Sequence, residues 1–228
     1  MPISTLTAPY LVVLGGGGHG KVVVDALLAS EAEGRLAILD ERPELHGTKL
    51  FGVMVLGGDE LLTEAASRGF THFVCGVGGA RDNLRRRQAF ERGLGAGLTP
   101  HRVTHPAALL SSRSSVGRGT VALAGVTINA GAHIGDNVIL NTRSIVEHDC
   151  RVGDHAHIGP GAILSGGAIV ENSALIGAGA VLAPGVRVGE SAVVGAGAVV
   201  LKNVAAGERV AGVPATPLNE REPGGPDE

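Results

Sequence analysis

The residues best suited to acid–base chemistry are a histidine between two acids, Glu147-His148-Asp149. An imidazole titrates near neutral pH, and a neighbouring carboxylate can fix its tautomer and keep it basic. The triplet therefore has the properties that a general base needs. The alternative, from the residues alone, is a solvated turn in which the acids only flank an exposed imidazole.

Aliphatic residues recur at every sixth position from Leu110 to Val200, and fifteen of these sixteen positions hold Leu, Ile or Val, with Ala122 as the exception. A small residue follows four places later in each hexad. A period of six does not fit a helix, which needs apolar residues every 3.6 positions. The repeat predicts short extended segments joined by tight bends, each stacking on its neighbours in a solenoid.

This pattern resembles the hexapeptide-repeat acyltransferases, whose repeats form a left-handed parallel β-helix with three hexads per coil. The resemblance implies that residues eighteen apart stack on each other. Gly166 then lies one coil after His148, and its N–H could hold an oxyanion near the base. No two of the repeat's four histidines (His133, His148, His155 and His157) are eighteen apart, so we predict no metal site of stacked histidines.

The N-terminal half begins with a short apolar run, residues 10–14, followed by a glycine-rich loop and a predicted helix at residues 21–29. Gly15, Gly17 and Gly20 fit GxGxxG, and Asp40 follows twenty residues after the last of them. This layout is typical of a Rossmann-type turn, which binds phosphate at the helix N-terminus and places an acid at a ribose hydroxyl. His19 inside the loop can donate to phosphate or stack on a base. The alternative is a glycine turn that serves packing alone.

Further along, the sequence predicts strands at residues 53–56 and 71–76 and helices at residues 59–67 and 83–92. Alternating strands and helices indicate a small parallel sheet, with ligands bound at the carboxyl ends of the strands. Gly78 follows the last strand and is placed to face the same ligand. The run Arg85-Arg86-Arg87 is interpreted as a solvated helix face.

We therefore expect an α/β Rossmann-like domain at residues 1–103, a left-handed parallel β-helix at residues 104–206, and a closing segment with a mobile tail at residues 207–228. A net charge of −3 gives no electrostatic case for nucleic acid or an anionic membrane. No apolar run is long enough to span a membrane, and the N-terminus lacks the layout of a signal peptide. A cytoplasmic protein is expected, with Cys75 and Cys150 as reduced, buried thiols.

In residues 139–157 and in the GxGGHG-type loop, the sequence resembles the hexapeptide transferases that acetylate nucleotide-linked amino sugars or sialic acid. The resemblance implies that His148 is the general base, oriented by Asp149 or Glu147, with Asn141 near the attacking amine. It implies that acetyl-CoA lies in a groove between subunits of a homotrimer. The implied acetyl-CoA contacts are His157, Gly166, Ala178 and Ala196, and the implied nucleotide-sugar contacts are Gly17, Gly18, His19, Asp40, Glu41 and Gly78.

The function expected from this resemblance is N-acetylation of a nucleotide-linked 4-amino-4,6-dideoxy sugar by direct attack on acetyl-CoA, without a metal. Cys150 occupies a small-residue position that should point into the prism, so an acyl-enzyme on this thiol is not expected. Two alternatives stay open from the sequence. One is O-acetylation of sialic acid or a related sugar, and the other is a dinucleotide-binding regulatory protein that uses the β-helix as a scaffold.

Overall fold

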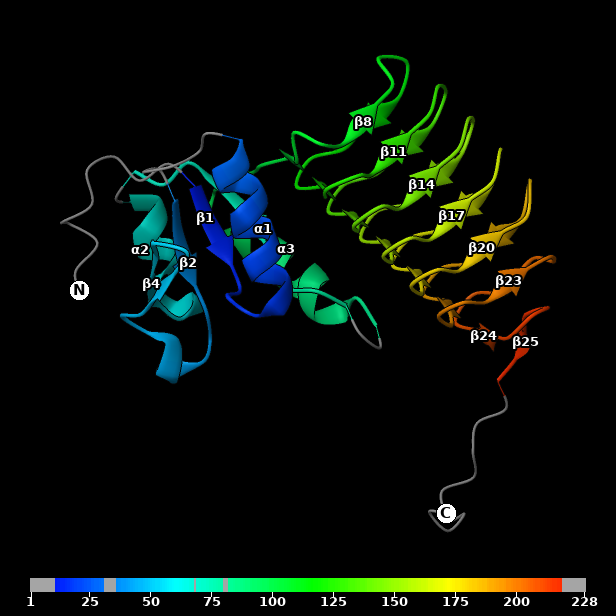
Figure 1. Ribbon diagram of the computed structural model, residues 1–228. Helices are drawn as coiled ribbons and strands as arrows, with labels where there is room; N and C mark the ends of the chain where they lie inside the picture. The colour runs from blue at the N-terminus through cyan, green and yellow to red at the C-terminus, as the bar shows by residue number, and fades with distance from the viewer. Residues whose placement is uncertain (1–10, 31–35, 68, 80–81, 219–228) are drawn as a thin grey trace, which may run out of the picture.

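The computed structural model describes residues 11–30, 36–67, 69–79 and 82–218. The expected mobile tail, residues 219–228, lies outside the described residues. Two parts are visible in Figure 1: an α/β domain, and a β-helix whose coils stack toward the C-terminus. The expected fold, a Rossmann-like domain followed by a β-helix of hexapeptide repeats, is confirmed.

The N-terminal domain is built on one sheet with the strand order β3-β4-β2-β1-β5-β6, parallel except for the β3–β4 pair. Its strands are β1 (Leu11–Leu14), β2 (Leu36–Leu39), β3 (Lys49–Leu50), β4 (Val53–Gly57), β5 (His72–Cys75) and β6 (Thr99–Pro100), and its helices are α1 (Gly18–Ala29), α2 (Leu62–Ser67) and α3 (Leu84–Gly95). Two short 3-10 helices cover Pro43–Leu45 and Asp59–Leu61.

Continuous apolar runs make the central strands. All four residues of β1 are buried, as expected for a parallel strand with both faces covered. Helix α1 begins at Gly18, three residues before the predicted start, so its first turn includes the end of the glycine-rich loop. The predicted helix at residues 59–67 divides into a 3-10 turn and α2. No helix in the described part of the chain is long and apolar enough to cross a membrane.

The β-helix has three faces of short strands, parallel except for β25, which runs antiparallel to β24. Each face is named here by its first strand. The β7 face contains β7 (Val103–Thr104), β10 (Val121–Ala122), β13 (Ile139–Leu140), β16 (His157–Ile158), β19 (Leu175–Ile176), β22 (Val193–Val194), β24 (Arg209–Ala211) and β25 (Thr216–Pro217). The β8 face contains β8 (Leu109–Leu110), β11 (Thr127–Ile128), β14 (Ile145–Val146), β17 (Ile163–Leu164), β20 (Val181–Leu182) and β23 (Val199–Val200). The β9 face contains β9 (Ser115–Val116), β12 (His133–Ile134), β15 (Arg151–Val152), β18 (Ile169–Val170) and β21 (Arg187–Val188).

The hexad positions explain this architecture. The second residue of each repeat strand is the recurring aliphatic residue, and these side chains form one buried core with the small residues at the corners. Strands pair with a shift of eighteen residues, such as Ile145 with Ile163. The stacking predicted from the hexads is therefore confirmed.

The repeat departs from strict register at its end. Val188 bridges to Val204, and Val193 pairs with Arg209, so the last coil is two residues shorter than eighteen. Val204 thus takes a strand position and not the corner position that the hexad count predicts. At the other end, Thr104 stands six residues before Leu110, and its polar side chain hides this hexad from the aliphatic pattern.

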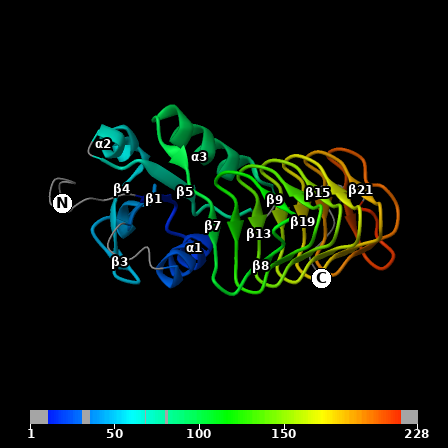
Figure 2. The same cartoon turned by 90° about the horizontal axis from the view of Figure 1, so that it is seen from above.

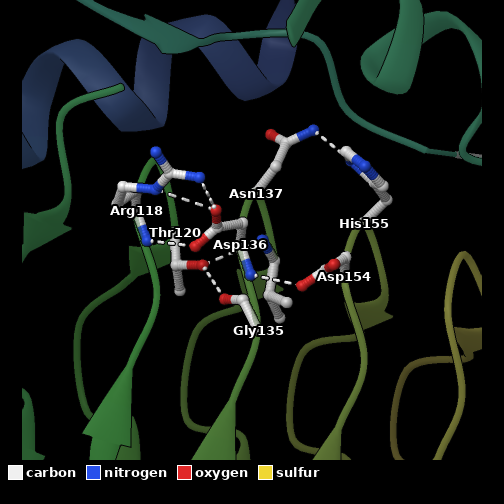
Figure 3. A network of polar contacts seen from close by, with 8 residues as sticks. Arg118, Thr120, Gly135, Asp136, Asn137, Asp154 and His155 are labelled. Atoms are coloured by element: carbon white, nitrogen blue, oxygen red, sulfur yellow. Dashed lines mark hydrogen bonds and ion pairs between the residues drawn. The ribbon is translucent and has the colours of Figure 1, made fainter. Parts of the chain in front are cut away.

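A ladder of acids and amides runs along the edge between the β9 face and the β7 face (Figure 3). Asp136 Oδ1 accepts the N–H of Arg118 at 2.6 Å, and Asp154 Oδ1 accepts the N–H of Asp136 at 2.8 Å. Each bond joins one coil to the next and satisfies a turn N–H that would otherwise lack a partner. A Cβ at Gly135 would lie 2.3 Å from Asp154 Oδ1, which explains why glycine precedes Asp136.

The N-terminal domain lies where the β-helix begins, with α1 and α3 on the side that meets the prism (Figure 2). Helix α1 packs on the β7 face through a shared apolar core with Val103, Val121 and Leu123. Helix α3 places Phe90 against the ring of His155, with centroids 5.5 Å apart. The two domains therefore have a common, buried interface.

Candidate active site

His148 lies in the turn after β14, on the edge between the β8 and β9 faces. Its Nδ1 is 2.8 Å from Asp149 Oδ2, and both side chains are exposed in the single chain. The hydrogen bond to Asp149 raises the pKa of His148, because the carboxylate favours the imidazolium. Nε2 on the other side of the ring is left for a substrate.

The two acids beside His148 have different partners. Asp149 contacts the imidazole, whereas Glu147 Oε2 accepts a hydrogen bond from Asn129 Nδ2 at 2.9 Å, one coil earlier. The geometry therefore favours Asp149 as the residue that orients His148. Glu147 instead links two neighbouring coils through its hydrogen bond with Asn129.

Gly166 lies directly against the imidazole of His148. A Cβ at this position would be 2.6 Å from His148 Nε2 and 2.7 Å from Cε1, closer than any ordinary contact. The stacking expected from the eighteen-residue spacing is thus observed. The Gly166 N–H donates no hydrogen bond among the described residues, so it is free to face a ligand beside the base.

Cys150, the next residue after Asp149, points away from this edge. Its Sγ is inside the prism and donates to the carbonyl of Ser165 at 3.2 Å. Burial raises the pKa of Cys150, which disfavours the thiolate that a nucleophile would need. Both Cys75 and Cys150 are buried free thiols, as expected.

The glycine-rich loop between β1 and α1 is held against the loop that follows β5. A Cβ on Gly20 or on Gly76 would lie 2.1 Å from the carbonyl oxygen of Gly15, so both positions require glycine. Gly78 lies beside His19, with its Cβ position 3.2 Å from that of His19. Gly78 thus lies next to the first glycine loop, and its contact with a shared ligand stays a prediction.

Asp40 holds this loop from the end of β2. Its carboxylate accepts the Gly16 N–H at 2.6 Å and contacts the Arg42 guanidinium at 2.8 and 3.0 Å. The bond from Arg42 is the largest reason that the pKa of Asp40 falls to about 2. Both oxygens are therefore in use already, and the contact of Asp40 with a ribose stays a prediction.

A cavity of about 380 Å³ opens at the carboxyl ends of the N-terminal strands, beside α3. Arg92 lies in its lining, 2.6 Å from Asp59 and 3.4 Å from Glu41. The remaining lining residues are Leu14, Gly15, Asp40, Arg42, Val77, Arg85, Gln88 and Ala89. Such a position is where α/β sheets bind ligands. Gly17 and Gly18 line a separate cavity of about 230 Å³ next to it, on the α1 side.

Four other predicted residues gather on and next to the β7 face. His157 is buried in β16, and the amide nitrogen of Asn141 lies 3.3 Å from its Nε2. Ala178 and Ala196 lie on successive turns of the edge between the β7 and β8 faces, where both are exposed. Among the described residues their N–H groups donate to no acceptor, so they offer a row of free backbone donors.

Electrostatics separates His148 from the histidines near the domain interface. Burial lowers the pKa of His19 to about 3, and electrostatic repulsion from His157 and Arg86 lowers it further. Burial, with Arg86 as the second cause, lowers the pKa of His157 to about 4. Both rings are neutral and weakly basic near pH 7, whereas the pKa of His148 is raised. His148 is therefore the best base of the three.

Within one chain, these residues form two groups on different edges. Asn141 lies on the edge before β14 and His148 on the edge after it, so the β8 face separates them. Asn141 contacts His157 in this arrangement and forms no hydrogen bond with His148. The single chain therefore does not bring Asn141 and His148 onto one edge.

Arg86 corrects the interpretation of the arginine run. Arg85 and Arg87 are exposed, but Arg86 is 0% exposed and reaches into the domain interface. The solvated-face prediction is thus wrong for Arg86. Helical spacing contained the signal that was missed, because Arg86 begins the same i, i+3, i+4, i+7 stripe as Ala89, Phe90 and Gly93, all of them buried.

Two family models match the chain. The model of the PglD N-terminal domain matches residues 10–92, and the model of bacterial transferase hexapeptide repeats matches residues 131–166 and 167–202. A search of curated proteins found no match. The two models together cover both halves of the structure described above.

Solved structures match the whole architecture. A histidine-to-asparagine mutant of perosamine N-acetyltransferase from Caulobacter crescentus, in complex with CoA and GDP-perosamine, is 34% identical with a TM-score of 0.88; the match covers 95% of this chain and 100% of that one. The chain belongs to the hexapeptide-repeat sugar acetyltransferases. The acetyltransferase domain of PglB from Neisseria gonorrhoeae FA1090, in complex with acetyl coenzyme A, is 35% identical with a TM-score of 0.85 over 93% of this chain and 100% of that one. WeeI from Acinetobacter baumannii AYE is 27% identical with a TM-score of 0.81 over 92% and 99%.

As a hexapeptide-repeat sugar acetyltransferase, the protein is an enzyme, and acetyl-CoA is its co-substrate. This assignment decides against the regulatory scaffold that the sequence left open. The N–H groups of Gly166, Ala178 and Ala196 donate no hydrogen bond among the described residues, and their contacts with acetyl-CoA stay a prediction. Within the described residues, no group of three or more His, Cys, Asp or Glu side chains is placed to bind a metal ion.

Proposed function

We propose that the enzyme transfers the acetyl group of acetyl-CoA to the amino group of a nucleotide-linked 4-amino-4,6-dideoxy sugar. The observation that carries this proposal is the likeness over nearly the whole chain to the perosamine N-acetyltransferase from Caulobacter crescentus in complex with CoA and GDP-perosamine. That likeness includes the N-terminal domain, which an acetyltransferase of free sugars would not need for nucleotide binding.

In the proposed reaction the sugar amine attacks the thioester carbonyl carbon directly. His148 Nε2 takes one proton from the amine as the C–N bond forms, and the Gly166 N–H faces the oxyanion of the tetrahedral intermediate. The C–S bond then breaks, and the imidazolium returns its proton to the departing CoA thiolate. Asp149 holds the ring in the tautomer that leaves Nε2 free to accept this proton.

The nucleotide would lie against Gly17, Gly18 and His19, with Asp40 and Glu41 in the lining of the adjoining cavity and Gly78 beside His19. Acetyl-CoA would lie along the edge that carries Ala178 and Ala196, next to His157. Asn141 would contact the reacting amine. These assignments agree with the free backbone donors and with the neutral state of His157.

We further propose a homotrimer formed through the β8 face. Its outward side chains are apolar or Thr, and in the single chain they are exposed (Leu109) or only partly buried (Thr127, Ile145, Ile163, Val181 and Val199). Outward positions of the β9 face are mostly polar, and those of the β7 face are largely buried against the N-terminal domain. Cyclic packing of β8 faces would place the His148 edge of one subunit beside the Asn141 edge of the next.

The test is a thiol-release assay with acetyl-CoA and a panel of UDP-, dTDP- and GDP-linked 4-amino-4,6-dideoxyhexoses, with free sialic acid as a competing acceptor. Thiol release with one nucleotide sugar, together with an N-acetylated product by mass spectrometry, supports the proposal and identifies the nucleotide. Turnover of sialic acid alone would contradict it and establish O-acetylation instead.

A further inference from the structure

Arg86 is a buried cation in the domain interface, and no acid in the described part of the chain pairs with it. Its guanidinium donates to the carbonyls of Asn137, His155 and Ala156, the last two at 2.7 and 3.2 Å. No carboxylate of the described residues forms an ion pair with it. A buried charge is costly unless it is well bonded, so a residue used only for packing would be better served by an apolar side chain.

The carbonyls that Arg86 binds belong to two successive coils, at the edge between the β9 and β7 faces. Asn83, one helical turn earlier, donates to the carbonyls of Ser173 and Ala174 on the following coil, at 3.0 and 3.2 Å. The first turn of α3 thus fastens the N-terminal domain to three coils in sequence. A planar guanidinium with several donors is suited to such bridging.

This attachment lies close both to His157 on the β-helix and to the glycine loop of the N-terminal domain. Ala156, which Arg86 contacts, directly precedes His157 in β16, and His157 contacts Asn141. The chain that enters α3 carries Gly78, which packs on His19 in the glycine loop. Arg86 therefore couples the position of the nucleotide loop to the position of His157.

We infer that Arg86 is a positioning residue for acetyl transfer, which fixes the N-terminal domain on the β-helix so that a sugar bound by one domain meets the thioester bound by the other. The inference rests on the proposed function, because it needs an acceptor held by the N-terminal domain. The two binding sites are separate, so loosening the interface affects their mutual placement more than either affinity. A misplacement of about 1 Å is enough to lower a rate about 100-fold.

The experiment compares Arg86→Met with Arg87→Met, an exposed neighbour whose guanidinium pairs with Glu91 at 2.9 Å. CoA binding is titrated by calorimetry, and kcat is expressed per CoA-binding site with the nucleotide sugar that the acceptor panel identifies. We expect Arg86→Met to lower this kcat about 100-fold, with the dissociation constants for CoA and nucleotide sugar within threefold of wild type. Arg87→Met should match the wild type.

A purely structural role makes a different prediction. Arg86→Met would then lower the number of CoA-binding sites, while kcat per site stayed at the wild-type value, and this result would overturn the inference. If Arg86→Met does not fold, Arg86→Lys retains the charge but not the planar set of donors, and the same kcat per site decides the matter.

Hydrogen exchange of residues 137–139 and 155–158 separates this inference from the proposed function. Faster exchange there in the Arg86 variant, but not in Arg87→Met, is expected from a loosened interface. Unchanged exchange overturns the positioning role, whichever acceptor the enzyme uses. Absence of turnover by the wild-type enzyme with every nucleotide sugar would contradict the proposed function instead.

Discussion

Replacing Gly166 by alanine tests the base and its surroundings with a single methyl group. Gly166 is absent from the positions with positive φ, so its backbone accepts alanine without strain. The atoms that the new Cβ meets first are Nε2 and Cε1 of His148, at 2.6 and 2.7 Å. The imidazole is the far end of an exposed side chain, so it can move while the coil stays in place.

The size of the effect follows from these distances. An ordinary contact of Cβ begins at 3.4 Å, so Nε2 must move by roughly 1 Å, which is enough to cost about 100-fold in rate. A 100-fold loss corresponds to about 2.7 kcal/mol in the activation free energy. The KM for acetyl-CoA should change less than kcat, because the other proposed contacts on the neighbouring edge are unaltered.

Steady-state thiol release, with circular dichroism to follow thermal unfolding, is the assay. Gly185→Ala is the control, since it lies on the same edge one coil beyond Gly167 and a Cβ there meets nothing within 4 Å. Its φ of +69° makes alanine cost about 1 kcal/mol of stability, without a loss of kcat. If Gly166→Ala folds and retains kcat within twofold of wild type, the base is not His148 in this position.

Three further results are expected. His148→Ala should lower kcat by about 10²- to 10⁴-fold with thermal unfolding unchanged; a normal kcat would exclude the base role. Asp149→Asn should move the acidic limb of kcat/KM to lower pH, because Asp149 raises the pKa of His148 and the base is active when deprotonated; an unmoved limb would assign it to another group. Ile163→Arg, on the β8 face, should sediment as a monomer in analytical ultracentrifugation and lose activity in the thiol-release assay. Ile169→Arg, on the β9 face, should still sediment as a trimer; the reverse result would place the interface elsewhere.

Most of the β-helix could be predicted from the sequence, because the same six-residue pattern repeats along it. A strict six-residue period determines which side chains point inward and which residues stack, and from it the contact of Gly166 with His148 could be predicted across eighteen positions. The glycine loop could also be predicted from the sequence. Its glycines are needed because Gly20 and Gly76 approach one carbonyl so closely that no side chain fits.

Contacts between the two halves could not be obtained from local patterns. The buried stripe of α3 could have marked Arg86 as buried, but no local pattern shows that its guanidinium meets backbone carbonyls more than fifty residues away. Asn141 and His148 are seven residues apart, yet strand β14 of the β8 face lies between them, so they are on different edges. Asp40 has the spacing of a ribose ligand, whereas its observed partners are Gly16 and Arg42.

The three edges of the prism differ in structure, and this difference bears on the proposed assembly. The edge between the β9 and β7 faces is stiffened by the Asp136–Asp154 ladder, and there α3 attaches the N-terminal domain through Asn83 and Arg86. The other two edges border the β8 face and carry the free backbone donors and His148. Because the attachment lies away from the β8 face, a neighbouring subunit of the proposed trimer would approach that face without displacing the N-terminal domain. A loss of assembly and a loss of domain docking should therefore be separable by mutation.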